Sequence, residues 1–342
     1  MSETQPADTS AFLVLGGAEI ARLTEPATLI DIAEAALRKT SDLSARQDVR
    51  RVLDLAETGG ACLSVMYAAI DDRPLFGAKV LSVFPENFAH GLPSHRGGIL
   101  LFERTRGTPV ALIDGGATTA WRTAAASAAA TRLLARADAD VLCVLGYGEQ
   151  AHRHVELLAR VRPLRELRVW GRDPRKAEAF AAGYRVRGLA ARAIDDAAQA
   201  VRGAGIVCTV TSSRTPVLSG DWLDPGTHVN AVGASVPSWR ELDDACLVRA
   251  GVWVDYMPMA LTSAGEIVEG LAKGLIRHEE LRGEIGAALA GLAPGRRDRA
   301  EITLYRSLGV PAQDIEFANH FVALARAAGL GSAAVLEGAT HA

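Results

Sequence analysis

A glycine-rich segment directly after an apolar run is the sharpest chemical signal in the sequence. Residues 141–145 read VLCVL, and Gly146-Tyr-Gly148-Glu-Gln-Ala151 follow at once. In a GxGxxA segment the first glycine permits a tight turn, the second lets the backbone approach a pyrophosphate, and the small last residue lets helix and strand pack closely. The N–H groups that open the following helix also favour phosphate oxygens. The segment predicts a dinucleotide-binding turn, with an ordinary glycine-rich connection as the plainer alternative.

The residues after the next apolar run bear on which dinucleotide binds. Residues 167–170 read LRVW, and the cations Arg172, Arg175 and Lys176 follow closely. An enzyme that uses NAD usually places an acid here for the ribose hydroxyl, whereas guanidinium and ammonium groups suit a 2′-phosphate. Asp173 is the competing signal, because it could face the ribose or cap the helix that begins at the next proline. We expect NADPH to be preferred, with NADH as the alternative.

Two cations in apolar surroundings suggest an anion site. Arg122 lies in a run rich in Ala, and a helix capped by Thr118 or Thr119 would place it in the first turn. A guanidinium there binds a carboxylate with two hydrogen bonds, while the helix dipole also favours an anion. Lys79 stands on an otherwise apolar strand, where a lysine either extends to water or meets a ligand. For both residues a position without a ligand is the plainer alternative.

Histidine could supply acid–base chemistry but no metal site. His95 follows a Leu-Pro-Ser segment and could donate a proton near pH 7, although a packing or surface role is the alternative. His152 and His154 are two positions apart on an expected helix, so they point to different faces. No group of His, Asp or Glu has the spacing of a metal site, and we expect no metal.

The elements that must position these residues are of two kinds. Apolar residues recur at helical spacing over 24–39, and residues 61–70 and 75–84 alternate as strands around a DDRP turn, which indicates an antiparallel pair. Residues 99–114 repeat the strand–turn–strand pattern. From Thr118 onward short β-branched runs alternate with helical stretches, which is typical of a parallel sheet wrapped by helices. We therefore expect a β-rich part with a leading helix, then an α/β part, and a final helix.

Composition narrows the class of protein. The chain has 342 residues, a formal net charge of -3 and 5% aromatic residues. A nucleic-acid binder would usually show a basic excess, so no nucleic-acid partner is expected. The chain has no run of about 18 apolar residues that would span a membrane, and its polar start has no signal-peptide pattern. We expect a cytoplasmic protein without a membrane partner.

Several separate motifs along the chain carry a family resemblance. They are GAK at 77–79, FPEN at 84–87, GLP at 91–93, GTP at 107–109, WRTAA at 121–125, the GxGxxA segment, NAVG at 230–233, RELD at 240–243 and the segment that begins with EITL, 301–309. Together they resemble the ornithine cyclodeaminase/mu-crystallin family over nearly the whole chain. The resemblance implies an α/β fold and a homodimer. In each subunit a Rossmann dinucleotide-binding domain (119–314) is inserted into a β-rich α+β dimerisation and substrate domain (11–118 plus 315–342).

The resemblance also implies which residues form the site. Arg122 and Lys79 would bind the substrate carboxylate, an upstream arginine best matched by Arg46 would join them, and Ser235 would contact the substrate. His95 would lie on the nicotinamide side. The expected cofactor-binding residues are Ser94, Thr123, Gly146, Gly148, Glu149, Gln150, Arg172, Arg175, Lys176, Thr211 and Val232. Glu241 and Asp243 are expected to be structural, because they lie in a turn entering a helix.

Departures from the family pattern bear on the reaction. Cyclodeaminases of the family carry an Asp where this chain has Ser235, and a Glu where it has Ser64. Serine is uncharged at neutral pH and cannot act as a carboxylate base. The resemblance therefore implies NAD(P)H-dependent reduction of an imine or ketimine next to a carboxylate, giving an amino acid, with Lys79 and His95 as catalytic residues. The alternatives are an amino-acid dehydrogenase, a cyclodeaminase, and an NADPH-linked protein that binds a small ligand without turnover.

Overall fold

The chain folds into two units. The computed structural model describes residues 12–55, 60–233 and 235–336. Unit 1 comprises the described residues of 1–25, 43–122 and 310–342, and unit 2 those of 26–42 and 123–309. The division differs from the expected one mainly at 26–42, because this helix packs against helices of unit 2 rather than on the β-rich sheet. The other boundaries fall a few residues from those expected.

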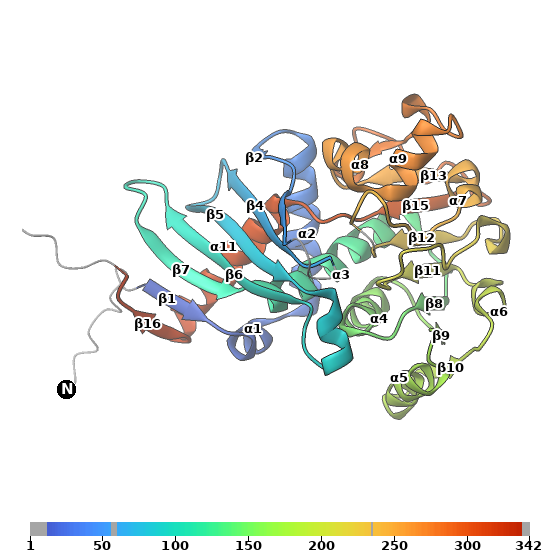
Figure 1. Ribbon diagram of the computed structural model, residues 1–342, viewed down its shortest axis with the longest axis horizontal. Coiled ribbons are helices and arrows are strands. Elements are labelled where there is room, and N and C mark those ends of the chain that lie inside the picture. Colours follow the sequence, from blue (N-terminus) through green and yellow to red (C-terminus); the bar gives the residue numbers. More distant parts are fainter. Residues whose placement is uncertain (1–11, 56–59, 234, 337–342) are drawn as a thin grey trace, which may run out of the picture. The chain divides into compact units, whose positions relative to one another are not determined.

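Unit 1 is built on an eight-stranded sheet (Figure 1). Its elements are β1 (Phe12–Leu15), α1 (Gly17–Leu23), β2 (Ala45–Gln47), β3 (Arg51–Asp54), β4 (Cys62–Ile70), β5 (Leu75–Val83), the 3-10 helix η1 (Pro85–His90), β6 (His95–Glu103), β7 (Pro109–Asp114), α11 (Pro311–Ala328) and β16 (Ser332–Ala334). The strand order is β16-β1-β7-β6-β5-β4-β2, and β3 also pairs with β4. The predicted antiparallel pairs are confirmed as β4 with β5 and β6 with β7.

Alternation along these strands gives the sheet two different faces. Helix α11 packs on one face, which carries a cross-strand row of buried residues: Ile113, Ile99, Lys79 and Met66. The other face carries an apolar row that is half-buried or exposed, here called the outer row: Val14, Leu112, Leu100, Ala78 and Tyr67. Lys79 is the one charged member of the buried row, so its ammonium group is directed toward α11 rather than toward solvent.

A buried amide fixes α11 against β5. Asn319 Oδ1 accepts a hydrogen bond from the Leu75 N–H at 3.2 Å, and its Nδ2 donates to the Leu75 carbonyl at 3.1 Å. Nearby, Arg73 Nε and Glu316 Oε2 form an ion pair at 2.6 Å. These contacts lie at the start of β5, shortly before Lys79. They set the register of α11 against the strand that carries the lysine.

Unit 2 is a doubly covered parallel sheet. Its elements are α2 (Pro26–Ser41), β8 (Val141–Leu145), α4 (Glu149–Val161), β9 (Glu166–Trp170), α5 (Pro174–Val186), β10 (Ala190–Ala193), α6 (Ala197–Val201), β11 (Ile206–Thr209), η2 (Gly220–Trp222), β12 (His228–Ala231), α7 (Asp244–Arg249), β13 (Ala250–Val254), α8 (Met257–Ser263), α9 (Gly265–Ala272), η3 (His278–Glu280), β14 (Gly283–Glu284), α10 (Ile285–Leu289) and β15 (Ile302–Arg306). The order is β10-β9-β8-β11-β12-β15-β13-β14. All pairs are parallel.

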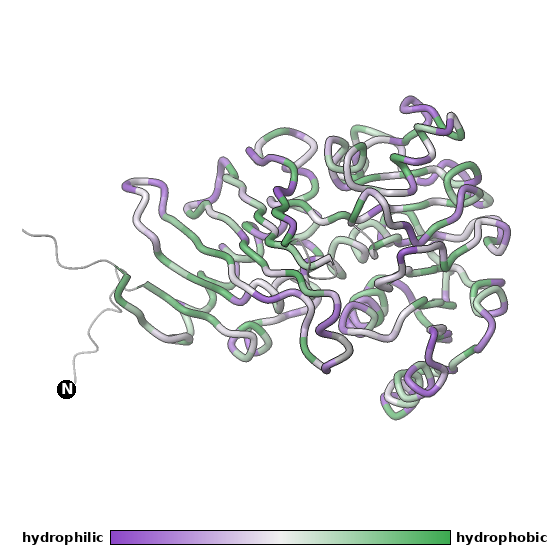
Figure 2. Tube along the Cα trace, in the orientation of Figure 1, coloured by the Kyte–Doolittle hydropathy of each residue, from purple (hydrophilic) through white to green (hydrophobic). Residues whose placement is uncertain are grey.

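The central strands of unit 2 show why both faces are covered. Strands β8, β11, β12 and β15 are buried at every residue, as expected when helices pack on both sides of a parallel sheet. In Figure 2 the hydrophilic colour marks several of the turns between elements, such as the tip of the β6–β7 hairpin. Among the described residues, no helix is both long and apolar enough to cross a bilayer. The predicted alternation of strands and helices after residue 118 is confirmed.

Helix α3 (Gly115–Leu134) is shared by the two units and begins earlier than predicted. Asp114 Oδ1 accepts a hydrogen bond from the Ala117 N–H at 2.9 Å, so Asp114 rather than Thr118 or Thr119 caps the helix. Thr118 instead donates its hydroxyl to the Asp114 carbonyl at 2.7 Å. The prediction of a threonine cap is wrong because Asp114, the last residue of β7, caps α3 directly.

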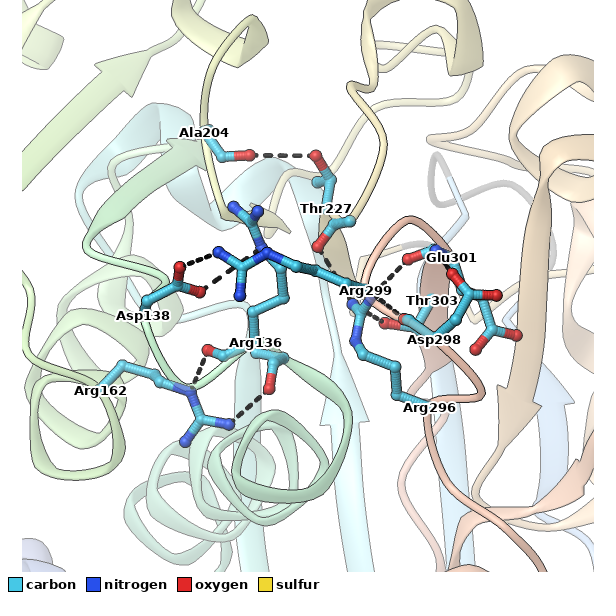
Figure 3. A network of polar contacts seen from close by, with 12 residues as sticks. Arg136, Asp138, Arg162, Ala204, Thr227, Arg296, Asp298, Arg299, Glu301 and Thr303 are labelled. Atoms are coloured by element: carbon cyan, nitrogen blue, oxygen red, sulfur yellow. Dashed lines mark hydrogen bonds and ion pairs between the residues drawn. The ribbon is translucent and has the colours of Figure 1, made fainter.

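Two arginines close the other end of α3 (Figure 3). The last carbonyls of a helix lack partners within it. The Arg162 guanidinium donates to the carbonyls of Thr131 and Ala135 at 2.9 and 2.7 Å. Arg296 Nε donates to the Leu134 carbonyl at 2.6 Å. These bonds anchor the C-terminal end of the helix whose N-terminal half carries Arg122.

Candidate active site

Lys79 lies on the face of the unit 1 sheet that α11 covers, where its side chain contacts other polar side chains. Its side chain is almost wholly buried, and Nζ lies 2.7 Å from Asp314 Oδ2 and 3.3 Å from Thr119 Oγ1. An ammonium group has three N–H donors, so these contacts leave one for a ligand. Burial, opposed by Asp314 and reinforced by the charge of Arg122, lowers the pKa of Lys79 to about 7. The lysine therefore exchanges a proton near neutral pH.

Arg122 approaches the same carboxylate from α3. Its side chain is 5% exposed, Nε lies 3.2 Å from Asp314 Oδ1, and Nη1 donates to Gln313 Oε1 at 3.3 Å. The Nη2 group makes no contact of either kind among the described residues. The expected help from the helix dipole is wrong, because α3 starts at Gly115 and places Arg122 in the second turn, beyond the reach of that effect.

Asp314 joins the two cations, and sequence reasoning missed it. It lies in the first turn of α11, where an acid is ordinary because it complements the helix dipole. The structure shows instead that it is fully buried between Lys79 and Arg122. With Lys79 protonated, two buried cations share one carboxylate, which leaves a surplus positive charge. Gln313 Nε2 nearby is a buried donor without a partner among the described residues.

The structure does not place the expected upstream arginine beside the buried cations. Arg46 on β2 has a side chain that is 78% exposed and pairs with Asp71 at 3.2 Å, so the structure does not bring it to the buried cations. Arg50, which follows β2, is close enough for its positive charge to help lower the pKa of Lys79 and of His95, as the charge of Arg122 also does. The sequence contains a signal for Arg50, because this residue also precedes an apolar strand, β3. The choice between Arg46 and Arg50, which are four positions apart, depends on where β2 ends.

His95 lies at the start of β6 on the face that carries Lys79. Its Nδ1 shares a hydrogen bond of 2.8 Å with the hydroxyl of Ser94, which is buried. Desolvation, and then the positive charges of Lys79, Arg50 and Arg122, lower the pKa of His95. The imidazole is neutral at pH 7.

In unit 2 the glycine-rich turn has the geometry of a phosphate cradle. Gly146 has a φ of 126° and a Cβ there would lie 2.7 Å from the Val210 carbonyl oxygen, so only glycine fits. Gly148 is the N-cap of α4 and has no side chain to cap it, and a Cβ at this residue would meet nothing within 4 Å. The open N-terminus of α4 therefore suits a pyrophosphate. These residues fit a dinucleotide.

The end of β9 carries the predicted cations at the surface. Arg172, Arg175 and Lys176 are exposed and form no ion pair among the described residues. Asp173 is the N-cap of α5 and accepts hydrogen bonds from the backbone N–H groups of Arg175 and Lys176 at 3.0 and 3.3 Å. Of the two alternatives for Asp173, the structure shows the helix cap.

Comparison with known proteins shows the family. A model described as the ornithine cyclodeaminase/mu-crystallin family matches residues 12–326. The chain belongs to this family. The resemblance that the motifs predicted is thus confirmed over nearly the whole chain, and so is the predicted fold class, a Rossmann-type domain together with a β-rich domain.

Relatives within the ornithine cyclodeaminase/mu-crystallin family include reductases. The Mus musculus protein named ketimine reductase mu-crystallin is 37% identical over 298 residues, which cover 86% of this chain and 90% of that protein. The structure of Thermococcus litoralis Δ(1)-pyrroline-2-carboxylate reductase in complex with NADH and L-proline has a TM-score of 0.91 at 30% identity, covering 94% of this chain and 99% of its own. An archaeal alanine dehydrogenase dimer with bound NAD has a TM-score of 0.90 at 31% identity, covering 95% and 99%.

The other predicted residues of this ornithine cyclodeaminase/mu-crystallin family member are divided between its units. Ser94 lies in unit 1. Thr123, Glu149, Gln150, Thr211, Val232 and Ser235 lie in unit 2. Their roles toward cofactor or substrate remain predictions. Asp243 is structural as expected, because it caps α7 and accepts a hydrogen bond from the Cys246 N–H at 3.0 Å. Among the described residues, no group of three His, Cys, Asp or Glu side chains could hold a metal.

Proposed function

We propose that the protein reduces a C=N bond next to a carboxylate, with a nicotinamide dinucleotide as hydride donor and an amino acid as product. The observation that carries this proposal is the buried pair Lys79 and Arg122, for which Asp314 is the one anionic partner among the described residues, so that a surplus positive charge remains. Buried charge is costly unless it is paired, so such a cluster favours an anionic ligand. The family relatives named as reductases act on substrates of this kind by their names.

The chain's own residues would bind and position the substrate in this reaction. Arg122 offers its Nη2 group, and Lys79 its remaining N–H, to the carboxylate, which fixes the position of the adjacent imine carbon. Asp314 holds both cations in place from the opposite side. A bound nicotinamide supplies the hydride to the imine carbon. The imine nitrogen then needs one proton, unless the substrate arrives protonated, and the product carries a C–H and an N–H in place of the double bond.

Lys79 is the better of the two predicted proton donors. An efficient general acid has a pKa near the working pH, and the pKa of Lys79 is lowered to about 7. His95 is held neutral at pH 7 by its lowered pKa, so it carries no acidic proton to give. We therefore assign proton donation to Lys79, which would pass to the imine nitrogen the N–H that faces Thr119 Oγ1, and leave His95 a role in shaping the site.

Turnover with defined substrates tests the proposed function. The purified protein would be mixed with NADPH and, separately, with a preformed cyclic ketimine such as Δ1-pyrroline-2-carboxylate, with pyruvate plus ammonia, and with ornithine. Oxidation of NADPH with the ketimine alone is the expected result. Faster turnover of pyruvate plus ammonia would assign a dehydrogenase, and consumption of ornithine without added cofactor would assign a cyclodeaminase. Tight binding of a ketimine without any turnover would overturn the assignment as an enzyme.

We propose that NADPH is preferred over NADH. Asp173 is occupied at the N-terminus of α5, and Arg172, Arg175 and Lys176 stand unpaired among the described residues. Replacing Arg172 with Ala is expected to raise the KM for NADPH by about 10-fold to 100-fold, since a hydrogen bond to a charged group contributes about 1.5–3 kcal/mol, and to change the KM for NADH little. Steady-state kinetics with both cofactors measures the ratio.

The matched control for this cofactor prediction is Arg165→Ala. Arg165 is exposed and pairs with Asp140 just before β9 begins, at the opposite end of the strand. This variant should leave both KM values unchanged. An equal rise in both KM values in Arg172→Ala, or a wild-type protein that works better with NADH, would contradict the NADPH preference.

We propose further that two copies pair through the outer row. This row crosses five strands with apolar side chains that remain accessible, among them Tyr67 and Leu112 at 42% and 39% exposed, and Val80 beside it is 39% exposed. Contiguous exposed apolar surface of this kind usually marks a protein interface. An archaeal alanine dehydrogenase of similar fold is described as a dimer.

Replacing Val80 with Glu is expected to convert the dimer to a monomer, because a charge would be buried without a partner. Sedimentation velocity at micromolar concentration measures the mass against the 36.0 kDa of one chain. Leu292→Glu is the matched control, since Leu292 is 79% exposed in unit 2. A monomeric wild type, or a Val80→Glu protein that stays dimeric, would contradict pairing through this face.

A further inference from the structure

A buried carboxylate joins the ends of two neighbouring strands in unit 2. Glu241 lies in the segment between β12 and α7 and is 2% exposed. Its Oε1 accepts a hydrogen bond from the Thr211 N–H at 2.7 Å and a second from the Thr211 hydroxyl. The backbone of Glu241 is fixed as well, because its carbonyl accepts hydrogen bonds from Val217 and Leu218 at 2.8 and 3.0 Å. Thr211 is thereby held just past the end of β11.

Gly233, in the turn after β12, packs directly on the same carboxylate. A Cβ at Gly233 would lie 2.3 Å from the Thr211 carbonyl oxygen and 2.4 Å from Glu241 Oε2. The Gly233 N–H also donates to the Thr209 carbonyl at 3.2 Å. Thr209, Thr211, Gly233 and Glu241, here called the Glu241 cluster, thus join the ends of β11 and β12 into one tightly packed group.

The Glu241 cluster stands next to the glycine-rich turn. Strand β8 has β9 on one side and β11 on the other. Val210 N donates to the Leu145 carbonyl at 3.0 Å, and the Val210 carbonyl is the group that a Cβ at Gly146 would strike. A dinucleotide in a doubly wound sheet crosses the carboxyl ends of the strands at this switch point. With the adenosine half at β9, the nicotinamide half falls on the side of β11 and β12.

We propose that Glu241 is a positioning residue for the nicotinamide half of the cofactor. It holds Thr211 and the Gly233 turn in one arrangement, so that the segments after β11 and β12 are ordered before the nicotinamide arrives. Preorganised segments lower the entropic cost of binding and of holding a reacting group in position. The inference rests on the proposed function, because it assumes that a nicotinamide dinucleotide is the ligand.

Binding of two ligands to Glu241→Ala tests the proposal. Isothermal titration would compare NADPH with 2′-phospho-ADP-ribose, which lacks the nicotinamide. The variant is expected to bind NADPH about 10-fold more weakly, as the loss of two hydrogen bonds to a carboxylate allows, while its affinity for 2′-phospho-ADP-ribose stays within about 2-fold. Glu241→Gln keeps the Oε1 acceptor and the volume, so it is expected to restore most of the NADPH affinity.

A second variant covers the case in which Glu241→Ala does not fold. In Gly233→Ala the added Cβ would displace Thr211 and Glu241 within the Glu241 cluster. This variant is expected to bind NADPH more weakly and to bind 2′-phospho-ADP-ribose as the wild type does. Gly183→Ala is its control, because a Cβ at this exposed position in α5 meets nothing within 4 Å.

The outcomes separate the two proposals. The positioning role alone is overturned if Glu241→Ala and Gly233→Ala lose affinity equally for both ligands. It is also overturned if neither variant loses affinity for NADPH. A wild-type protein that binds neither of these ligands nor NADH overturns the proposed function, and the positioning role with it.

Discussion

Lys79→Met is expected to lower kcat/KM for the imine by at least about 10³-fold. Proton transfer by a positioned side chain contributes about 10²–10⁴-fold, and a hydrogen bond between a cation and the substrate carboxylate contributes about 1.5–3 kcal/mol more. Methionine is an unbranched side chain one atom shorter than lysine, and Asp314 keeps Arg122 as a partner at 3.2 Å. The buried charges then balance, so the variant should fold with a Tm near that of the wild type.

Two measurements accompany the Lys79→Met experiment. The affinity for NADPH should be unchanged, because no residue expected to bind the cofactor has been altered. A loss of this affinity would mean that the defect is not confined to substrate binding and proton transfer. Lys273→Met is the control for replacing a lysine as such, since Lys273 pairs at the surface with Glu269 and Asp244. A Lys79→Met enzyme within about 10-fold of the wild type would rule out proton donation by Lys79.

Asp314→Asn is expected to lower kcat/KM at neutral pH by about 10²-fold and to move the pH profile toward acid. The charge of Asp314 and its hydrogen bond raise the pKa of Lys79, against burial and the charge of Arg122. Without them this pKa falls below about 7, by about 1–3 units for the loss of a close opposite charge. Because reduction needs the protonated lysine, activity is full below this pKa and is lost as pH rises through it.

The pH profile distinguishes this effect from simple loss of structure. Wild type and Asp314→Asn would be compared with the same imine and saturating NADPH, so that titration of the substrate is common to both. Asparagine leaves the buried Arg122 without a countercharge, which should cost about 3–5 kcal/mol of unfolding free energy, measured by denaturant unfolding. An Asp314→Asn profile that falls at the wild-type pH, merely at lower amplitude, would show that Asp314 does not set the pKa of Lys79.

Local patterns made the glycine-rich turn and the exposed cations after β9 predictable. The GxGxxA turn and the cations after β9 are defined by residues within about thirty positions of one another, and their geometry follows from strand, turn and helix alone. The antiparallel pairs β4–β5 and β6–β7 could also be predicted from the sequence, because short turns fix the register of neighbouring strands.

The rest of the anion site depends on contacts between distant parts of the chain. Asp314 reads as an ordinary acid in a helix start, and only the packing of α11 on β5 gives it two buried cations. Arg46 and Arg50 look alike in the sequence, but in the structure Arg46 lies on β2, where it is exposed and pairs with Asp71, whereas Arg50 follows that strand. Helix α3 began earlier than expected because its cap is contributed by the preceding strand.

Strand β5 places opposite demands on adjacent positions. Ala78 and Val80 face the outer surface, while Lys79 between them faces α11. Inserting or deleting a single residue in the turn at 71–74 would invert this pattern: the ammonium would be expelled to the exterior and an aliphatic side chain would confront Asp314. Length variation should therefore be tolerated in this hairpin only in steps of two, whereas loops elsewhere on the surface remain free to change by any number.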